Sequence, residues 1–403
     1  MKKINIVLVL GWLSVTCIAQ EPTSWRGPTA DGIYPESGLL KEWPANGPEI
    51  LWTFEELGQG HSSAIVEGGF LFTSGMINGK GYLFKLNLDG TLVYKIEYGP
   101  EFTESWYGTR GTPVIAGDKI YLLSGHGKLV CFNNADGKIL WSKNLFKSFD
   151  GRNIQWGVNE TPVVDGDKIY VTPGGRNNNV VALNRHSGEL VWSSKTKGEL
   201  SAYCTPLLFE HNGRKILATH TSSHLVGIDA GNGKMLWSQH HPNQWSVHPN
   251  TPIYHEGSLF YFSGYGQGGG LLQLSADGSS AKRQWFNSKL DSRMGGAVLV
   301  DGYLYGSGDN NREWRCLDWN TGKEMYVSSA IGKGVVIYAD GMLYCYSERG
   351  ELALVKADPD SFTVSGKTRV THGSEQHWAH PVIYDGVLYL RHGRALIAYK
   401  VKS

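Results

Sequence analysis

The chain has 403 residues, and its 38 basic and 37 acidic side chains give a formal net charge of +1. This balance excludes a protein that binds nucleic acid through a basic surface, and an apolar content of 41% excludes a disordered chain. Glycine supplies 52 residues, which follow no period of three, so a collagen-like structure is excluded too. Abundant glycine together with 14 tryptophans favours one large all-β unit of short strands and tight turns.

The N-terminus begins with a short basic segment and about a dozen apolar residues. Such a run is too short to span a bilayer, and it predicts a signal peptide over residues 1–19. Lipidation at Cys17 is the less favoured alternative, because Ser14 and Thr16 stand where a lipoprotein signal carries Leu and a small residue. Since no later segment is apolar for 18 residues, we expect an exported protein, periplasmic or secreted, without an integral membrane segment.

Internal repeats dominate the rest of the sequence. Four segments align without gaps, each with a glycine four residues before a final aromatic: 131–141 (CFNNADGKILW), 182–192 (ALNRHSGELVW), 227–237 (GIDAGNGKMLW) and 316–326 (CLDWNTGKEMY). Their final aromatics are 51, 45 and 89 residues apart, the last spacing being two units, and looser copies end at Tyr94 and Trp285. A period of 40–50 residues with short strands in each unit predicts a β-propeller.

The number of blades follows from the apolar segments that begin each unit. Eight inner strands are expected near Ser63, Pro113, Pro162, Pro206, Pro252, Ala297, Val335 and Pro381. The last unit has room for only three strands, and residues 49–54 read as an outer strand without a blade of its own. We therefore predict an all-β, eight-bladed propeller over residues 49–403, closed by pairing of its N- and C-terminal strands, after a lead-in over residues 20–48.

The repeat pattern A-x-D-x-x-[TS]-G-x-x-x-W resembles the tryptophan-docking repeat of the quinoprotein-like (PQQ-like) propellers. That family includes the quinoprotein alcohol dehydrogenases and the BamB outer-membrane assembly factors. The lead-in segment 25–32 (WRGPTADG) is also similar to the start of many secreted PQQ-like repeat proteins. The resemblance covers nearly the whole mature chain, and it implies the fold much more strongly than a function, because one scaffold hosts many activities.

The loops that lead into the inner strands of a propeller gather on one face around the central channel, where a ligand meets several of them. Here these loops are rich in aromatic, basic and histidine side chains, and Trp106 is among them. We expect substrate binding by Trp156, Trp245, Trp378, His61, Tyr203 and Lys333. We expect Arg110 and Arg293 to pair with a carboxylate, and His248, His377, His380 and Tyr107 to transfer protons, as catalytic residues.

These residue types suit an acidic oligosaccharide. Tryptophan rings stack on the apolar faces of sugars, and arginine pairs bidentately with a carboxylate or sulfate. Removing the proton α to a uronate carboxylate is the slow step of β-elimination, and an arginine stabilises the enolate-like state. The sequence therefore predicts a monomeric lyase or dehydratase of polysaccharide degradation that acts on an acidic oligosaccharide, with no redox cofactor and no metal.

Structural roles compete with these assignments. Each tryptophan can pack between blades, His61 and His380 can be hydrogen-bonded structural residues, and Arg110 and Arg293 can bind carbonyls that line the channel. The cysteines of the mature chain are far apart and form no CxxC motif, so buried free thiols are expected, with a disulfide as the alternative: Cys131, Cys204, Cys316 and Cys345.

Two other functions stay open. The resemblance implies a quinone-dependent oxidoreductase, but those enzymes carry an adjacent cysteine pair, which this chain lacks. Their calcium is held by Glu and Asn, for which Glu160 and Asn250 are the possible counterparts, and no catalytic Asp can be assigned, so PQQ and calcium lack support. A BamB-like scaffold for protein assembly is the alternative in the binding class.

Overall fold

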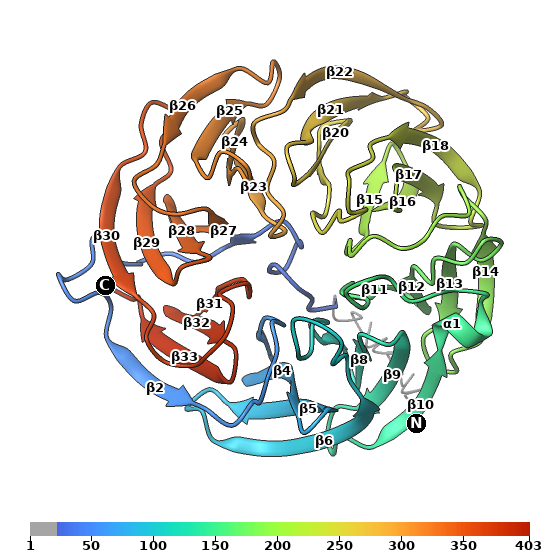
Figure 1. The fold of residues 1–403 in the computed structure, drawn as a ribbon, viewed down its shortest axis with the longest axis horizontal. Coiled ribbons are helices and arrows are strands. Elements are labelled where there is room, and N and C mark those ends of the chain that lie inside the picture. The colour runs from blue at the N-terminus through green and yellow to red at the C-terminus, as the bar shows by residue number, and fades with distance from the viewer. Residues whose placement is uncertain (1–21) are drawn as a thin grey trace, which may run out of the picture.

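The computed structural model describes residues 22–403. Eight antiparallel sheets stand around a central channel, which confirms the predicted eight-bladed β-propeller (Figure 1). The predicted signal peptide and Cys17 lie outside the described residues. Within the described range, no helix is long and apolar enough to cross a membrane.

Blades 1 to 4 each run in chain order from an inner strand to an outer strand. Blade 1 contains β3 (Ile65–Glu67), β4 (Phe70–Ile77), β5 (Lys80–Asn87) and β6 (Leu92–Pro100). Blade 2 contains β7 (Val114–Ala116), β8 (Lys119–Leu123), β9 (Lys128–Asn133) and β10 (Ile139–Asn144), followed by the helix α1 (Leu145–Ser148). Blade 3 contains β11 (Val163–Asp165), β12 (Lys168–Val171), β13 (Val180–Asn184) and β14 (Leu190–Ser194). Blade 4 contains β15 (Leu207–His211), β16 (Arg214–His220), β17 (His224–Asp229) and β18 (Met235–His240).

Blades 5 to 7 repeat this order, and blade 8 draws on both ends of the chain. Blade 5 contains β19 (Ile253–His255), β20 (Ser258–Ser263), β21 (Gly268–Leu274) and β22 (Ala281–Asn287). Blade 6 contains β23 (Ala297–Val300), β24 (Tyr303–Ser307), β25 (Trp314–Asp318) and β26 (Glu324–Ser328). Blade 7 contains β27 (Gly334–Ala339), β28 (Met342–Ser347), β29 (Glu351–Lys356) and β30 (Val364–Arg369), with β1 (Ile33–Tyr34) added at its inner edge. Blade 8 contains β31 (Val382–Tyr384), β32 (Val387–His392), β33 (Ala395–Lys400) and β2 (Ile50–Phe54).

Ring closure occurs at blade 8, where the N-terminal strand β2 pairs antiparallel with the C-terminal strand β33. The side chain of Trp52 on β2 then reaches blade 1, where its Nε1 donates to the carbonyl of Leu88 at 2.9 Å. Pairing removes the open edge of β33, and the tryptophan fastens the last blade to the first. The closure predicted from residues 49–54 is confirmed.

Contacts between neighbouring blades explain the spacing within the repeat. Trp141, at the end of the repeat in blade 2, donates from Nε1 to the carbonyl of Arg185 in blade 3. Its ring lies over Gly188, where a Cβ atom would stand only 2.9 Å from the ring. The same relation recurs between Trp192 and Gly233. The repeated glycine is therefore needed because the tryptophan of the preceding blade covers it.

The apolar core lies between the faces of adjacent blades. For example, Phe72 of blade 1 packs in one cluster with Ile120 and Phe132 of blade 2. The cysteines of the described residues are buried free thiols within these layers, as the sequence indicated: Cys131, Cys204, Cys316 and Cys345.

The lead-in crosses the central channel, which the sequence did not predict (Figure 1). Thr23 bridges Ile115 in blade 2, and β1 then pairs in parallel with β27 in blade 7. Between these two points, the buried guanidinium of Arg26 donates to the carbonyls of Gly295 and Ala297, at 2.6 and 2.5 Å. The lead-in is thus part of the folded ring and not an appendage.

We expect the substitution Arg26→Met to lower the free energy of unfolding by about 3 kcal/mol, because it leaves buried carbonyls without a donor. Urea denaturation measures the loss. Lys41→Met is the matched control in the same lead-in, since Lys41 is exposed and its ion pair with Asp340 contributes at most about 1 kcal/mol. Equal stability of the two variants would show that Arg26 does not anchor the lead-in.

Candidate functional site

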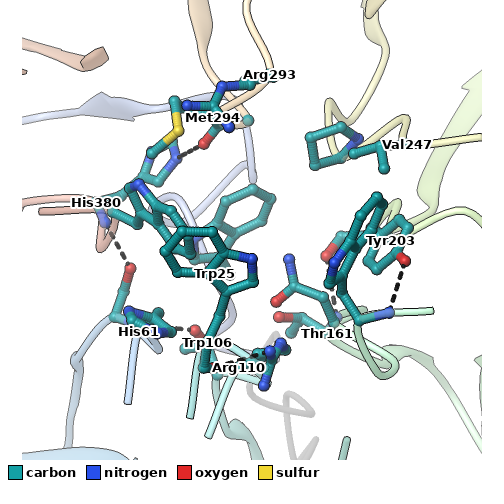
Figure 2. Close-up of a pocket in the computed structure, with 18 of the residues that line it drawn as sticks. Trp25, His61, Trp106, Arg110, Thr161, Tyr203, Val247, Arg293, Met294 and His380 are labelled. Atoms are coloured by element: carbon teal, nitrogen blue, oxygen red, sulfur yellow. Dashed lines mark hydrogen bonds between the residues drawn. The ribbon is translucent and has the colours of Figure 1, made fainter. Parts of the chain in front are cut away.

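A cavity of about 320 Å³ lies at the centre of the ring (Figure 2). Its walls come from the loops that lead into several inner strands, from the β20–β21 hairpin and from the lead-in. The aromatic members of the wall are Trp25, Trp106, Trp156, Tyr203, Trp245, Tyr265 and Trp378.

Two groups of contacting aromatic rings line the cavity, and Figure 2 shows Trp106 of one group and Tyr203 of the other on different sides of it. On one side, the ring of Trp156 lies 5.9 Å from that of Trp245 and 6.2 Å from that of Tyr203. On the other, the ring of Trp378 lies 5.2 Å from that of Trp106. Such an arrangement offers flat apolar surfaces to a ring-shaped ligand held between them.

Three of these aromatic residues have a backbone conformation that side chains of their size rarely adopt. The φ angles of Trp106, Tyr203 and Tyr265 are 47°, 70° and 62°. A left-handed conformation costs of order 1–3 kcal/mol in a residue other than glycine, and such strain gathers at functional sites. By contrast, Asn78 and Asp301 have positive φ in Asn-Gly and Asp-Gly hairpin turns, which require it.

A series of hydroxyl groups lines the cavity between neighbouring blades. The amide of Ser63 donates to Oγ1 of Thr112, and the amide of Thr161 donates to Oγ1 of Thr205, at 3.1 and 3.0 Å. At the junction between blades 8 and 1, the amide of His380 donates to Oγ of Ser63 at 3.0 Å. At these three junctions a hydroxyl group just before an inner strand links two blades, which gives the Thr-Pro dipeptides at Thr112 and Thr205 a structural role.

Arg110 is the cationic residue of the wall that has no ion pair within the described chain. Its Nη1 donates to the carbonyl of Gly108, and its Nη2 donates to those of Ser105 and Trp106, at 2.8, 3.0 and 2.9 Å. Burial lowers the pKa of this guanidinium to about 10, so it keeps its charge at neutral pH. Arg110 therefore makes the carbonyl contacts that were the structural alternative to ligand binding. These contacts hold the loop that carries Trp106.

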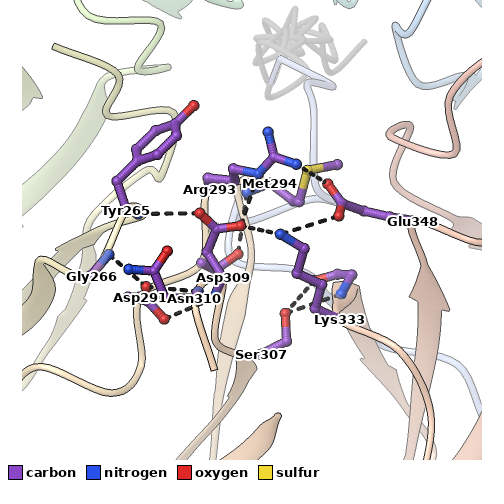
Figure 3. A network of polar contacts seen from close by, with 12 residues as sticks. Tyr265, Gly266, Asp291, Arg293, Met294, Ser307, Asp309, Asn310, Lys333 and Glu348 are labelled. Carbon is purple, nitrogen blue, oxygen red and sulfur yellow. Dashed lines mark hydrogen bonds and ion pairs between the residues drawn. The ribbon is translucent and has the colours of Figure 1, made fainter. Parts of the chain in front are cut away.

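Arg293 also lines the cavity, but protein carboxylates neutralise it (Figure 3). Its Nε donates to Asp309 at 2.9 Å and its Nη2 donates to Glu348 at 2.7 Å. Lys333 contacts the same two carboxylates and does not line the cavity. Burial alone would lower the pKa of Arg293, yet Glu348 and Asp309 outweigh it and raise that pKa. Arg293 therefore enters the wall as part of a balanced network.

Two histidines line the cavity. The ring of His61 lies 4.8 Å from that of Trp378, and an interaction with the backbone of Trp106 opposes the lowering of its pKa. Nε2 of His380 lies 3.0 Å from the carbonyl oxygen of Met294, and the edge of Trp25 packs on its ring. Burial lowers the pKa of both imidazoles to about 3, with further lowering by Arg110 at His61 and by Arg26 at His380. Both rings are therefore neutral at physiological pH.

The sequence-predicted residues divide by their place in the cavity wall. Those that the structure brings together there are His61, Arg110, Trp156, Tyr203, Trp245, Arg293, Trp378 and His380. Those that it places elsewhere are Tyr107, His248, Lys333 and His377.

Successive side chains of an extended loop point to opposite sides. This explains why His248, His377 and Tyr107 lie outside the cavity wall although a neighbour of each lines it. Val247 and Pro249 line the cavity, so the side chain of His248 between them points into the protein, where it stacks on His220 at 5.0 Å. Nε2 of His248 lies 3.2 Å from the carbonyl oxygen of Ser222. This placement leaves His248 no direct path for proton transfer in the cavity.

The same alternation affects two other predicted catalytic residues. Trp378 faces the cavity, whereas the neighbouring His377 stacks on His392 with 3.7 Å between ring centroids. Likewise Trp106 faces the cavity, whereas Tyr107 points to solvent and is 51% exposed. Neither His377 nor Tyr107 touches the space that a ligand would fill.

Sequence reasoning missed other wall residues. Trp25 comes from the lead-in, where the WRGP segment resembles a family feature but carries no local pattern that predicts a wall residue. Tyr265 comes from a glycine-rich hairpin loop, and Asn159 comes from the loop before blade 3. Their placement depends on the tertiary path of the chain, for which one sequence carries no local pattern.

The residues present do not fit a quinone held by calcium. No Asp or Glu is among the described residues that line the cavity, and no three described His, Cys, Asp or Glu side chains are grouped as metal ligands. Glu160 is buried and accepts from the amide of Thr172, and burial raises its pKa to about 8, so it is largely neutral. Asn250 uses its amide group on the carbonyls of Phe262 and Ser292. We derive no chemistry through such a cofactor.

Several solved structures share this fold. BamB from Moraxella catarrhalis superposes with a TM-score of 0.63 at 12% identity, over 88% of this chain and 98% of that one. The quinohemoprotein alcohol dehydrogenase of Comamonas testosteroni superposes with a TM-score of 0.66 at 11% identity, over 93% of this chain and 79% of that one. The computationally designed Ika8 protein does so with a TM-score of 0.59 at 10% identity, over 87% and 99%. At such identities the likeness shows the fold alone.

Sequence comparison gives the family. No protein of curated function matches the chain. The sequence model of a family described as outer membrane protein assembly factor BamB matches residues 43–326, which is more than half of the chain. The chain therefore belongs to this family of PQQ-like β-propellers.

Proposed function

We propose that the protein is an exported carbohydrate-active propeller that binds an acidic saccharide in the aromatic cavity and acts on it by β-elimination. The observation that carries the proposal is the pair of facing aromatic groups around Arg110, a buried cation that forms no direct ion pair in the described chain, although the charge of the buried Glu101 acts on it. A sugar ring presents apolar faces to the tryptophans, and a uronate supplies a carboxylate that can pair directly with Arg110.

Arg110 has capacity for such a ligand. A guanidinium has five N–H groups, and three of those on Arg110 donate to loop carbonyls. The two that remain are on Nε and Nη1, on different edges of the guanidinium, so a carboxylate accepts from one of them, in a site whose low dielectric strengthens the pair. Because Arg293 is already bound by Asp309 and Glu348, we assign the primary contact with the uronate to Arg110.

The elimination needs a base and an acid near the same carboxylate. The base removes the proton on the carbon α to the carboxylate, a carbon–carbon double bond forms, and the bond to the β oxygen breaks as that oxygen takes a proton. His61 and Tyr203 both lie close enough to Arg110 for its charge to lower their pKa values. We assign His61, which is neutral, as the base and Tyr203, whose pKa burial raises to about 12, as the acid. Both ring nitrogens of His61 are buried, so the proposed step requires a rearrangement of the neighbouring wall that exposes one of them.

The test incubates the mature protein with uronate-containing oligosaccharides and follows the ultraviolet absorbance of the unsaturated product, with mass spectrometry to identify it. Elimination predicts a new product that absorbs in the ultraviolet. It also predicts that the masses of the two fragments sum to the mass of the substrate, because no water is added. Binding without any product would overturn the elimination and leave a lectin-like protein. Absence of both binding and product would overturn the whole proposal.

Stacking predicts that Trp245→Ala weakens saccharide binding about tenfold, because the variant loses an aromatic platform worth about 1–1.5 kcal/mol. Trp245 is 47% exposed at the cavity mouth, so the variant should fold normally. Phe286→Ala is the matched control, since Phe286 is 45% exposed on the outer strand β22. Titration calorimetry distinguishes the two, and equal affinities would exclude Trp245 from the binding surface.

Protein assembly is the second candidate. This chain covers 98% of the length of a BamB structure, and its outer strands expose apolar pairs such as Leu190 and Val191 on β14. An exposed apolar band of this kind suits contact with another protein. Co-purification of the tagged protein with barrel-assembly components, combined with no saccharide binding, would favour this role over the first.

A further inference from the structure

A second hollow adjoins the aromatic cavity. It is a groove of about 500 Å³ between blades 6 and 7, and it opens on the same face of the ring. Its walls are the β24–β25 hairpin, residues 329–333 before β27, and the β28–β29 hairpin. Arg293 lines both the groove and the cavity, so the two hollows share a wall.

The groove is lined by more cations than carboxylates. The cationic residues are Arg293, Arg312, Lys333 and Arg349, and the carboxylates are Glu348 and Glu351. Glu348 is bound by Arg293 at 2.7 Å and Lys333 at 3.3 Å. Glu351 accepts from the amide of Gly332 at 3.1 Å and lies 3.6 Å from Lys367. Both carboxylates of the wall are therefore already satisfied within the protein.

The two remaining arginines are available to a ligand. Arg312 and Arg349 are exposed, and neither forms an ion pair with any residue of the described range 22–403. They stand on opposite hairpins, one from blade 6 and one from blade 7, and both line the groove. The backbone of Arg312 has a φ of 58°, a left-handed conformation that favours glycine, so this long charged residue is held there at a cost in strain.

The network beneath them is rigid. Arg293 and Lys333 bridge Asp309 and Glu348, and the carboxylate of Asp291 accepts from the amides of Gly266 and Asp309 at 2.7 Å each (Figure 3). These contacts join hairpins of blades 5, 6 and 7 to the loop that carries Arg293. The floor of the groove is thus fixed before a ligand arrives, which lowers the entropy lost on binding.

We propose that this groove is a second anion site, which binds a sulfate or carboxylate group on a sugar unit next to the one in the aromatic cavity, through Arg312 and Arg349. The inference rests on the proposed function, and it narrows the substrate class to saccharides with anionic groups on neighbouring units. Both groups offer oxygen pairs that match the planar fork of arginine. Because Arg312 and Arg349 are exposed, their contribution to binding affinity falls as the salt concentration rises.

The test compares the wild-type protein with the double variant Arg312→Gln/Arg349→Gln in titration calorimetry. The probes are free glucuronate and glucuronate-containing trisaccharides that carry a second carboxylate, a sulfate ester or no second charge. We expect the double variant to bind both doubly charged trisaccharides at least about tenfold more weakly than wild type. Glucuronate and the trisaccharide without a second charge should bind both proteins equally, and the tighter charged probe identifies the anion.

Arg176→Gln/Lys195→Gln is the matched control, because it removes two exposed cations from blade 3, across the ring on the same face. An equal loss of affinity in this control, or an equal loss for glucuronate in the double variant, would overturn the inference. If both variants have the melting temperature of the wild-type protein, neither pair of substitutions changes affinity by destabilising the fold.

A second measurement does not depend on saccharide binding. Phenylglyoxal modification of the wild-type arginines, mapped by mass spectrometry, is repeated with inorganic sulfate and with the sulfated trisaccharide. Protection of Arg312 and Arg349 by sulfate, with no saccharide bound in calorimetry, would refute the proposed function and still support the anion site. Reaction of both arginines at the same rate with and without the two ligands would overturn the anion site.

Discussion

Acidification from pH 6.5 to pH 4 is expected to unfold the protein, because five buried or half-buried imidazoles, besides the fully buried His220, are neutral in the folded state and take up protons on unfolding. Burial lowers the pKa of each to about 3 or 4, against about 6.5 in an unfolded chain. They are His61, His241, His248, His377 and His380.

The direction follows from proton binding. Between these pKa values and about 6.5, the unfolded chain binds more protons than the folded protein, so stability falls as the pH falls. Each histidine contributes about 1.4 kcal/mol per pH unit in this window, and several together exceed the stability of an ordinary domain. Glu160 and Glu101 act in the opposite direction, because burial raises the pKa of both carboxyl groups, to about 8 for Glu160, but they are fewer than the histidines.

Urea midpoints measured between pH 7 and pH 4.5 test this expectation. The variant His248→Asn should show a shallower decline than wild type, because it removes one of the titrating rings. His255→Asn is the matched control, since the side chain of His255 is 46% exposed. Parallel declines in wild type, His248→Asn and His255→Asn would show that buried histidines do not control acid stability.

Replacement of Arg110 should produce the largest loss of activity. We expect Arg110→Gln to lower kcat/KM for a uronate oligosaccharide by about 10²–10³, because the variant loses the charge that stabilises the enolate-like state. Arg110→Lys keeps a positive charge without the planar fork, and it should lie between wild type and Arg110→Gln. Initial rates of formation of the unsaturated product give these values.

Two controls separate catalysis from structure, because Arg110 also holds the carbonyls of Ser105, Trp106 and Gly108. Arg152→Gln removes an exposed cation from the loop before blade 3, and its activity should equal that of wild type. Affinity for a saccharide without a carboxylate should be the same in Arg110→Gln as in wild type if the loop stays in place. Full activity of Arg110→Gln would exclude it as the partner of the uronate.

Much of the fold was predictable because the repeat is a local pattern with a local physical cause. Each unit needs a tryptophan to cover the next blade and a glycine beneath that tryptophan, as Trp141 and Gly188 show. The last unit lacks a fourth strand, and residues 49–54 form a strand without a blade of its own. Pairing of this strand with the last unit completes the blade and closes the ring.

The candidate site was predictable only at the level of loops. The composition of the loops showed that aromatic and basic residues gather around the channel, and Trp156, Trp245 and Trp378 do line it. The sequence could not tell which of two neighbours faces inward, as with Val247 and His248, because the phase of alternation is set where the loop leaves its strand.

Abundant glycine and tryptophan, balanced charge and a period of 40–50 residues thus determined an eight-bladed ring and the face on which a site would lie. Only the tertiary structure decided that the lead-in crosses the channel and brings Trp25 to the wall. It also separated two arginines that look alike in sequence, since Arg293 forms ion pairs with Asp309 and Glu348, whereas Arg110 donates to loop carbonyls and forms no direct ion pair in the described chain. The reason is physical: charge pairing and burial depend on residues distant in the chain, whereas strand and turn formation depend on neighbours.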